Sequence, residues 1–101
     1  MRKAKILFNG RPAGILTEEN GHYIFEYSKE YKGPSISRTM PREKEKFEFE
    51  EFPSFFDGLL PEGVNLEAFL RRTKIDRKNY FGQLLAVGQD LVGAVTVEEM
   101  A

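Results

Sequence analysis

The sequence predicts a small α+β protein whose mostly antiparallel sheet packs with three short helices. Segments with the two-residue periodicity of strands fill the N-terminal third of the chain. Between residues 55 and 85 the apolar spacing changes to that of helices, and one more β-rich segment follows. Strands first, helices next and a strand last is typical of α+β domains, so we expect an N-terminal meander completed by a C-terminal strand.

Three strands are expected at the N-terminus. Asn9-Gly10 separates two short apolar runs at residues 5–8 and 13–17, which is the pattern of a tight β-hairpin. Residues 22–27 follow another Gly-containing turn and carry an aromatic side chain at every second position. These segments predict a three-stranded meander.

A fourth strand, at the edge of the sheet, is expected over residues 35–40. This segment is short, rich in residues that favour β-structure and stopped by Pro41. The charge run at residues 42–46 is interpreted as a solvated loop.

Two helices are expected after Pro53, a residue well suited to a first helical turn. The apolar spacing predicts a short helix up to residue 60, broken by Pro61. A second helix is expected from residue 64 to residue 74, with Asn65 as its cap and basic residues at its C-terminus.

The third helix is expected to open at Asp76 or Arg77 and to end at Gly88, a natural C-terminal cap. The last strand is then placed at residues 91–97, where β-branched and small residues alternate.

Length and composition favour one domain over residues 1–101 with a small core. Fifteen Lys and Arg balance sixteen Asp and Glu, so the chain lacks the excess positive charge that is typical of nucleic-acid-binding domains. The chain has no cysteine, and no apolar run is long enough for a secretory signal or a membrane span. A cytoplasmic protein is the expectation.

No catalytic, metal or cofactor site is expected. His22 is the single histidine, so it has no partners at metal-ligand spacing. The glutamates between residues 43 and 51 lie in a charged stretch that is expected to be well solvated, which leaves acid–base catalysis as a weak third hypothesis. The serines have no base or nucleophile-elbow motif beside them.

The segment at residues 52–64 is the most distinctive part of the chain. Its phenylalanines and leucines fit a core helix, whereas Pro61 and Gly63 constrain a protruding turn that presents an acidic and an apolar side chain. We therefore predict a partner-binding face, made of Leu60, Pro61, Glu62, Gly63 and Val64, together with Met40 and Pro41.

Four segments resemble the N-terminal subdomain of HipA-type kinases. Residues 55–63, FFDGLLPEG, are similar to its FF-x-x-LLPEG segment, and residues 7–16, LFNGRPAGIL, to its opening hairpin. Residues 35–41, SISRTMP, and 84–95, LLAVGQDLVGAV, resemble its S-x-S-x-x-MP and LLA-x-G-x-D-x-x-GA segments. The four segments occur in the family's order and span nearly the whole chain.

A free-standing copy of this subdomain is similar to the HipS family of small proteins from three-gene HipBST toxin–antitoxin modules. The resemblance implies a non-catalytic antitoxin that binds and restrains a HipT-like serine/threonine kinase toxin. The alternative is a structural subunit that completes the toxin fold or bridges it to a HipB-like DNA-binding protein. No tryptophan follows the Pro-Glu-Gly turn, where Val64 and Asn65 stand.

Overall fold

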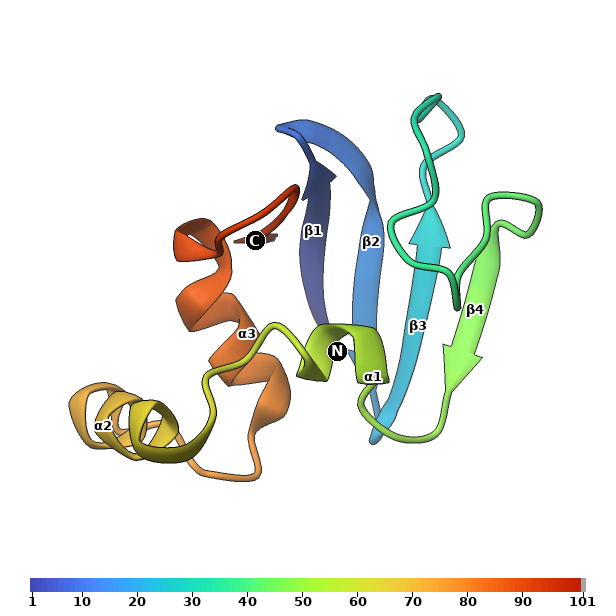
Figure 1. The fold of residues 1–101 in the computed structure, drawn as a ribbon. Coiled ribbons are helices and arrows are strands. Elements are labelled where there is room, and N and C mark those ends of the chain that lie inside the picture. Colours follow the sequence, from blue (N-terminus) through green and yellow to red (C-terminus); the bar gives the residue numbers. More distant parts are fainter. Residues whose placement is uncertain (101) are drawn as a thin grey trace.

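Five strands form one antiparallel sheet in the order β4-β3-β2-β1-β5 (Figure 1). The computed structural model describes residues 1–100. The strands are β1 (Arg2–Phe8), β2 (Arg11–Glu19), β3 (His22–Tyr27), β4 (Lys46–Phe49) and β5 (Val95–Glu99). The helices are α1 (Ser54–Asp57), α2 (Gly63–Thr73) and α3 (Tyr80–Val87), and the 3₁₀ turn η1 (Gly88–Asp90) follows α3 directly. The predicted α+β class is confirmed.

The N-terminal meander is confirmed, and the same turn chemistry builds both of its hairpins. Asn9 and Gly10 join β1 to β2 with φ angles of 51° and 81°, and Asn20 and Gly21 join β2 to β3 with 52° and 81°. Two consecutive positive φ angles are the requirement of the turns that match strand twist, and Asn-Gly meets it at low cost.

The two faces of the sheet have different environments. On one face the alternating side chains are buried, including Ile6, Leu16 and Phe25, and the helices cover this face (Figure 1). On the other face the alternating side chains include lysines and glutamates, and no helix covers them (Figure 1). The protein is therefore a two-layer structure with its core between the sheet and the helices.

The prediction of a strand at residues 35–40 was wrong, because this segment is a loop with a single bridge between Ser37 and Met40. In this loop, side chains rather than a neighbouring strand provide hydrogen-bond partners for the backbone. The Tyr27 hydroxyl accepts from the Ile36 amide (3.0 Å) and donates to the Met40 carbonyl (2.5 Å). The amide of Arg42 donates to Ser35 Oγ (2.9 Å).

The fourth strand lies instead at β4, where Phe47 and Phe49 pair with Phe25 and Tyr23 of β3. Its alternating glutamates and lysine face away from the core, so the sequence resembles a solvated charge run. The expected loop at residues 42–46 therefore ends at the first residue of this strand.

Four predicted boundaries were also wrong. Helix α1 ends at Asp57 rather than at residue 60. Helix α2 is capped by Glu62, and Asn65 lies inside its first turn. Helix α3 begins at Tyr80 rather than near Asp76, because the Asn79 side chain caps it by accepting from the Gly82 amide (3.0 Å). The last strand begins at Val95, since Gly93 adopts φ 119° just before it.

Candidate protein-binding surface

The connection between α1 and α2, residues 58–62, is a short turn held by its own backbone. The amides of Leu59 and Leu60 donate to the carbonyls of Phe56 (3.0 Å) and Asp57 (3.1 Å). At the other end the Glu62 carbonyl accepts from the first amides of α2. Gly63 has φ 57° with nothing within 4 Å of an added Cβ, so conformation rather than space favours glycine there.

The structure divides the predicted partner-binding residues into two groups. Leu60 and Met40 are 8% and 0% exposed and belong to the core, so their side chains are unavailable at the surface. Pro61 is half-buried, whereas Pro41, Glu62, Gly63 and Val64 are exposed. Val64 is 82% exposed, a large value for an apolar side chain at the start of a helix.

Two grooves, which we call the first and second grooves, meet at Leu60 and Pro61 of this turn. Glu62 and Gly63 line the first groove only, and Val64 lines neither. The first groove has a volume of about 390 Å³ and runs toward the start of α3. Its lining combines acidic, basic, aromatic and apolar side chains, namely Asp57, Leu60, Pro61, Glu62, Leu66, Arg77, Tyr80 and Gln83 with Gly63. Such a surface offers both apolar contact and charge.

The second groove has a volume of about 430 Å³ and lies between α2 and the end of α3. Most of its lining is apolar, with Leu59, Leu60, Pro61, Ala68, Phe69, Ala86, Val87, Leu91 and Val92 beside Asn65, Arg72 and Asp90. Val92 is 99% exposed at its rim. Neither groove includes Met40 or Pro41, so the predicted face is not one continuous hollow.

Sequence analysis missed Tyr80 and Val92 as surface residues. Both fit the apolar pattern of a regular element, Tyr80 in a helix and Val92 in a strand, and this pattern normally marks the core. In the structure Tyr80 is 41% exposed and its ring lies 5.7 Å from that of Phe52. The one local sign that Val92 lies in a turn was the neighbouring Gly93, which precedes the last strand.

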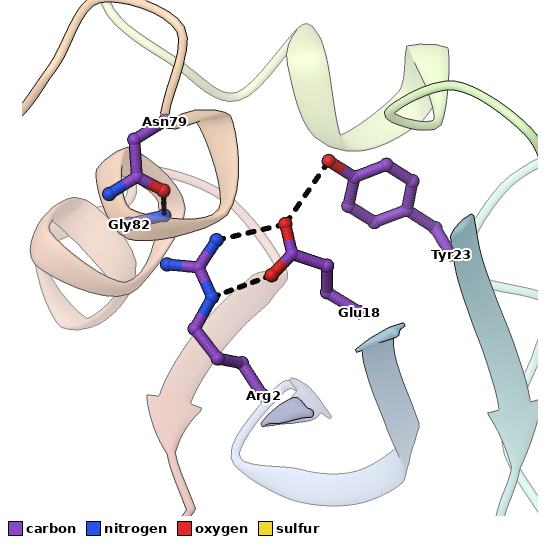
Figure 2. A network of polar contacts seen from close by, with 5 residues as sticks. All are labelled: Arg2, Glu18, Tyr23, Asn79 and Gly82. Atoms are coloured by element: carbon purple, nitrogen blue, oxygen red, sulfur yellow. Dashed lines mark hydrogen bonds and ion pairs between the residues drawn. The ribbon is translucent and has the colours of Figure 1, made fainter. Parts of the chain in front are cut away.

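An ion pair holds the sheet beside α3 (Figure 2). Arg2 of β1 donates to both carboxylate oxygens of Glu18 on β2, through Nε (2.7 Å) and a terminal nitrogen (2.9 Å). Its guanidinium also lies 4.9 Å from the ring centre of Phe81 on α3. The Tyr23 hydroxyl donates to the same carboxylate at 3.4 Å. The contact with Phe81 ties the first turn of α3 to strands β1 and β2.

The hydrogen bonds from Arg2 lower the pKa of Glu18 below its ordinary value. The same pairing raises the pKa of Arg2, and burial raises the pKa of Tyr23. Because the pKa of Glu18 is lower in the folded chain than in the unfolded chain, protonating this carboxylate favours unfolding.

We expect Glu18→Gln to lower the free energy of unfolding by about 0.5–1 kcal/mol at pH 7, the range for a partly exposed pair. The pair's contribution is complete above the ordinary glutamate pKa of 4.5 and is lost as the pH falls through the lowered pKa of Glu18. Urea unfolding at pH 7, 5 and 3 checks this prediction, since the gap between variant and wild type should close in acid. A gap that persists at pH 3 would contradict it, and Glu48→Gln on the open side of β4 serves as the control.

The loop before α3 and the helix α2 are joined by further polar contacts. Arg77 pairs with Glu67 of α2, and this pairing lowers the pKa of Glu67. The buried Gln83 side chain donates to the carbonyls of Asp76 (3.2 Å) and Arg77 (2.9 Å). These contacts hold the wall of the first groove in place.

Nothing in the described part of the chain gathers three or more metal-ligating side chains. His22 is exposed at the start of β3. The search for a helix with the length and apolarity to cross a membrane found none in residues 1–100. This surface offers a partner protein exposed apolar side chains, the exposed carboxylate of Glu62 and two grooves.

Comparison with known proteins gives three agreeing results. The family model described as HipA N-terminal domain matches residues 4–98. A solved structure described as the N-terminal domain of HipA toxin superposes with a TM-score of 0.83 at 26% identity, covering 100% of this chain and 94% of that one. An uncharacterized protein of Haemophilus influenzae is 29% identical over 99 residues, which cover 98% of this chain and 93% of that protein.

Proposed function

This chain belongs to the HipA N-terminal domain family, and from this premise we propose that it is an antitoxin that binds and restrains a HipT- or HipA-like kinase. The chain performs no chemistry in this proposal. The proposed partner is a serine/threonine kinase toxin, with a HipB-like DNA-binding protein as a further member of the complex.

The observation that carries the proposal is the exposed turn at the start of α2. Glu62 and Val64 are exposed beside the half-buried Pro61, and Val64 is 82% exposed. The turn and the two grooves beside it together supply apolar and charged contacts, which are the two kinds of contact that protein–protein interfaces combine. The backbone bonds at both ends of the turn preorganise it, which lowers the entropy cost of binding.

Inhibition by this surface requires only occlusion. A rigid turn that enters a kinase cleft, or a surface that holds the two lobes apart, prevents the closure on which phosphoryl transfer depends. Val64 is smaller than an aromatic anchor, so we assign the binding energy to the turn together with the apolar rim at Leu91 and Val92.

The Haemophilus relative supports a free-standing role for such a domain. The matched region makes up 93% of that protein, so the relative consists of little else. A domain of this kind that is separate from a kinase core is able to act on the kinase in trans.

We expect Val64→Asp and Glu62→Lys each to weaken kinase binding about tenfold or more, since a central contact typically contributes at least 1.4 kcal/mol. Both side chains are exposed. Aspartate near a helix N-terminus is favourable, so Val64→Asp should leave the thermal transition nearly unchanged, whereas Glu62→Lys places a cation at the N-terminus of α2 and should lower it slightly. Isothermal titration calorimetry against the kinase measures the affinity, with Glu43→Lys as the matched control. Unchanged affinity in both variants would remove this turn from the interface.

The structural alternative makes a different prediction. If the chain completes the toxin fold or bridges it to the DNA-binding partner, the complex forms while kinase activity stays the same. Autophosphorylation of the kinase, measured with and without an excess of this chain, distinguishes the two functions. If the kinase becomes less stable when this chain is removed, the structural role is favoured.

A further inference from the structure

The open face of the sheet carries a groove of about 380 Å³ that the proposed kinase contact does not use. Its lining residues alternate along the strands with the buried residues of the core face, so the groove lies on the opposite face of the sheet. The helices lie on the core side of the sheet (Figure 1). The main side chains of the groove come from the three central strands, namely Lys3, Lys5, Ile15, Thr17, Ile24 and Glu26.

The strand register orders these side chains across the sheet. Lys5 pairs with Ile15, which pairs with Glu26. In the next row on this face Lys3 pairs with Thr17, which pairs with Ile24. The groove therefore has cations on the β1 side, an apolar floor on β2 and β3, and an acid on the far wall.

None of the lysines that line the groove forms an ion pair within residues 1–100, although the strand register places Glu98 of β5 next to Lys5. Lys3, Lys5 and Lys29 line the groove, and the ion pairs formed by residues 1–100 involve Arg2 and Arg77 instead. Because residues two apart in a strand are separated by about 7 Å, Lys3 and Lys5 repeat at the spacing of alternate residues in an extended peptide.

We propose that this open face binds an extended acidic segment of a partner protein. The segment runs along β1, with apolar side chains on Ile15 and Ile24 and carboxylates beside Lys3 and Lys5. Glu26 orients it, since an acid on the β3 side would meet this like charge. The site is separate from the proposed kinase surface and does not depend on that function.

Charge on the same face argues for a protein segment rather than nucleic acid. Glu48 pairs with Ile24 on the β4 side, and Glu98 pairs with Lys5 on the β5 side. These carboxylates confine the positive charge to a strip about one strand wide, and the whole chain has a net charge of −1, so the face lacks the extended positive surface that a polyphosphate backbone needs. A short acidic peptide contacts the central cations without crossing the outer acids.

The test uses two synthetic octapeptides, one alternating glutamate with valine and one alternating glutamine with valine. Each is titrated into the ¹⁵N-labelled chain while amide shifts and fluorescence anisotropy are recorded. We expect the glutamate peptide to shift the amides of Ile15, Thr17 and Ile24 and to bind at least about tenfold more tightly than the glutamine peptide. Its affinity should fall as salt is raised.

Variants of the groove separate charge from folding. The pair Lys3→Gln and Lys5→Gln should abolish the preference for the glutamate peptide, and Glu26→Gln should strengthen binding. Lys44→Gln with Lys78→Gln, two exposed lysines outside the groove, is the matched control. Equal affinity for both peptides, shifts centred on residues 61–64, or equally tight binding of a 20-base-pair duplex at 150 mM salt would each overturn the proposal.

Discussion

Replacing Phe56 by alanine is expected to lower the free energy of unfolding by about 3–5 kcal/mol, the range for a fully buried aromatic side chain. Phe56 is 0% exposed, and its ring lies 6.0 Å from that of Phe25 on the sheet. It is the buried residue of the short helix α1, which has no side-chain cap. Its loss should release both α1 and the turn that follows.

Phe55 is the matched control, because it has the same chemistry one position earlier but is only half-buried against the core. We expect Phe55→Ala to cost clearly less. In a domain of this size each kcal/mol moves the melting temperature by about 4–8 °C, so thermal unfolding followed by circular dichroism resolves the difference. Equal losses for the two variants would mean that α1 does not anchor the turn.

Gly88→Ala is expected to be the second severe change, with a loss of about 2–3 kcal/mol or more, because overpacking against a rigid neighbour is costly. A Cβ at position 88 would lie 2.2 Å from the carbonyl oxygen of Val97. That atom belongs to the backbone of β5, so it cannot rotate away. The end of α3 or the last strand must move instead.

Gly82→Ala, in the helix α3 that precedes Gly88, provides a contrast. There the nearest atom to an added Cβ is the side-chain nitrogen of Asn79, 2.4 Å away, and this side chain is free to rotate. The lost cap costs about 1 kcal/mol and the gain in helix propensity is similar, so we expect little net change. Urea unfolding of the two variants compares them, and a small loss for Gly88→Ala would contradict the close packing of α3 on β5.

Local chemistry made the first half of the fold predictable. The two Asn-Gly turns and the alternating aromatic residues of β3 leave few other structures for residues 2–27. The helices were found for the same reason, since their apolar spacing differs from that of strands. Their starts were misplaced because the Asn79 cap and the Glu62 position depend on how the neighbouring turns fold.

The loop at residues 35–40 could not be predicted from propensity. Its isoleucine and threonine favour strands, but the hydroxyl of Tyr27 takes the hydrogen bonds that a neighbouring strand would take. Tyr27 stands 9 and 13 positions earlier in the chain, so this contact is tertiary. The prediction of β4 failed for the complementary reason, since its exposed charges hid the phenylalanines that face the core.

The structure shows which residues of the predicted binding face reach the surface. Glu62, Gly63 and Val64 are at the surface, whereas Leu60 and Met40 are buried. A sequence does not show whether an apolar residue is buried or exposed, so only the packing in the structure shows that Leu60 is buried and Val64 is exposed. The grooves could not be predicted from the sequence, because each combines residues of α2 with residues of α3 or of the segment after α3.

The most direct test of the proposed antitoxin is an autophosphorylation assay of its HipT- or HipA-like kinase with a stoichiometric excess of this chain, alongside size-exclusion chromatography of the mixture. We predict a stable complex with suppressed phosphorylation, and recovery of kinase activity when Val64→Asp replaces the wild-type chain. Phosphorylation that continues unchanged within a stable complex, or the absence of any complex, would contradict the proposed function.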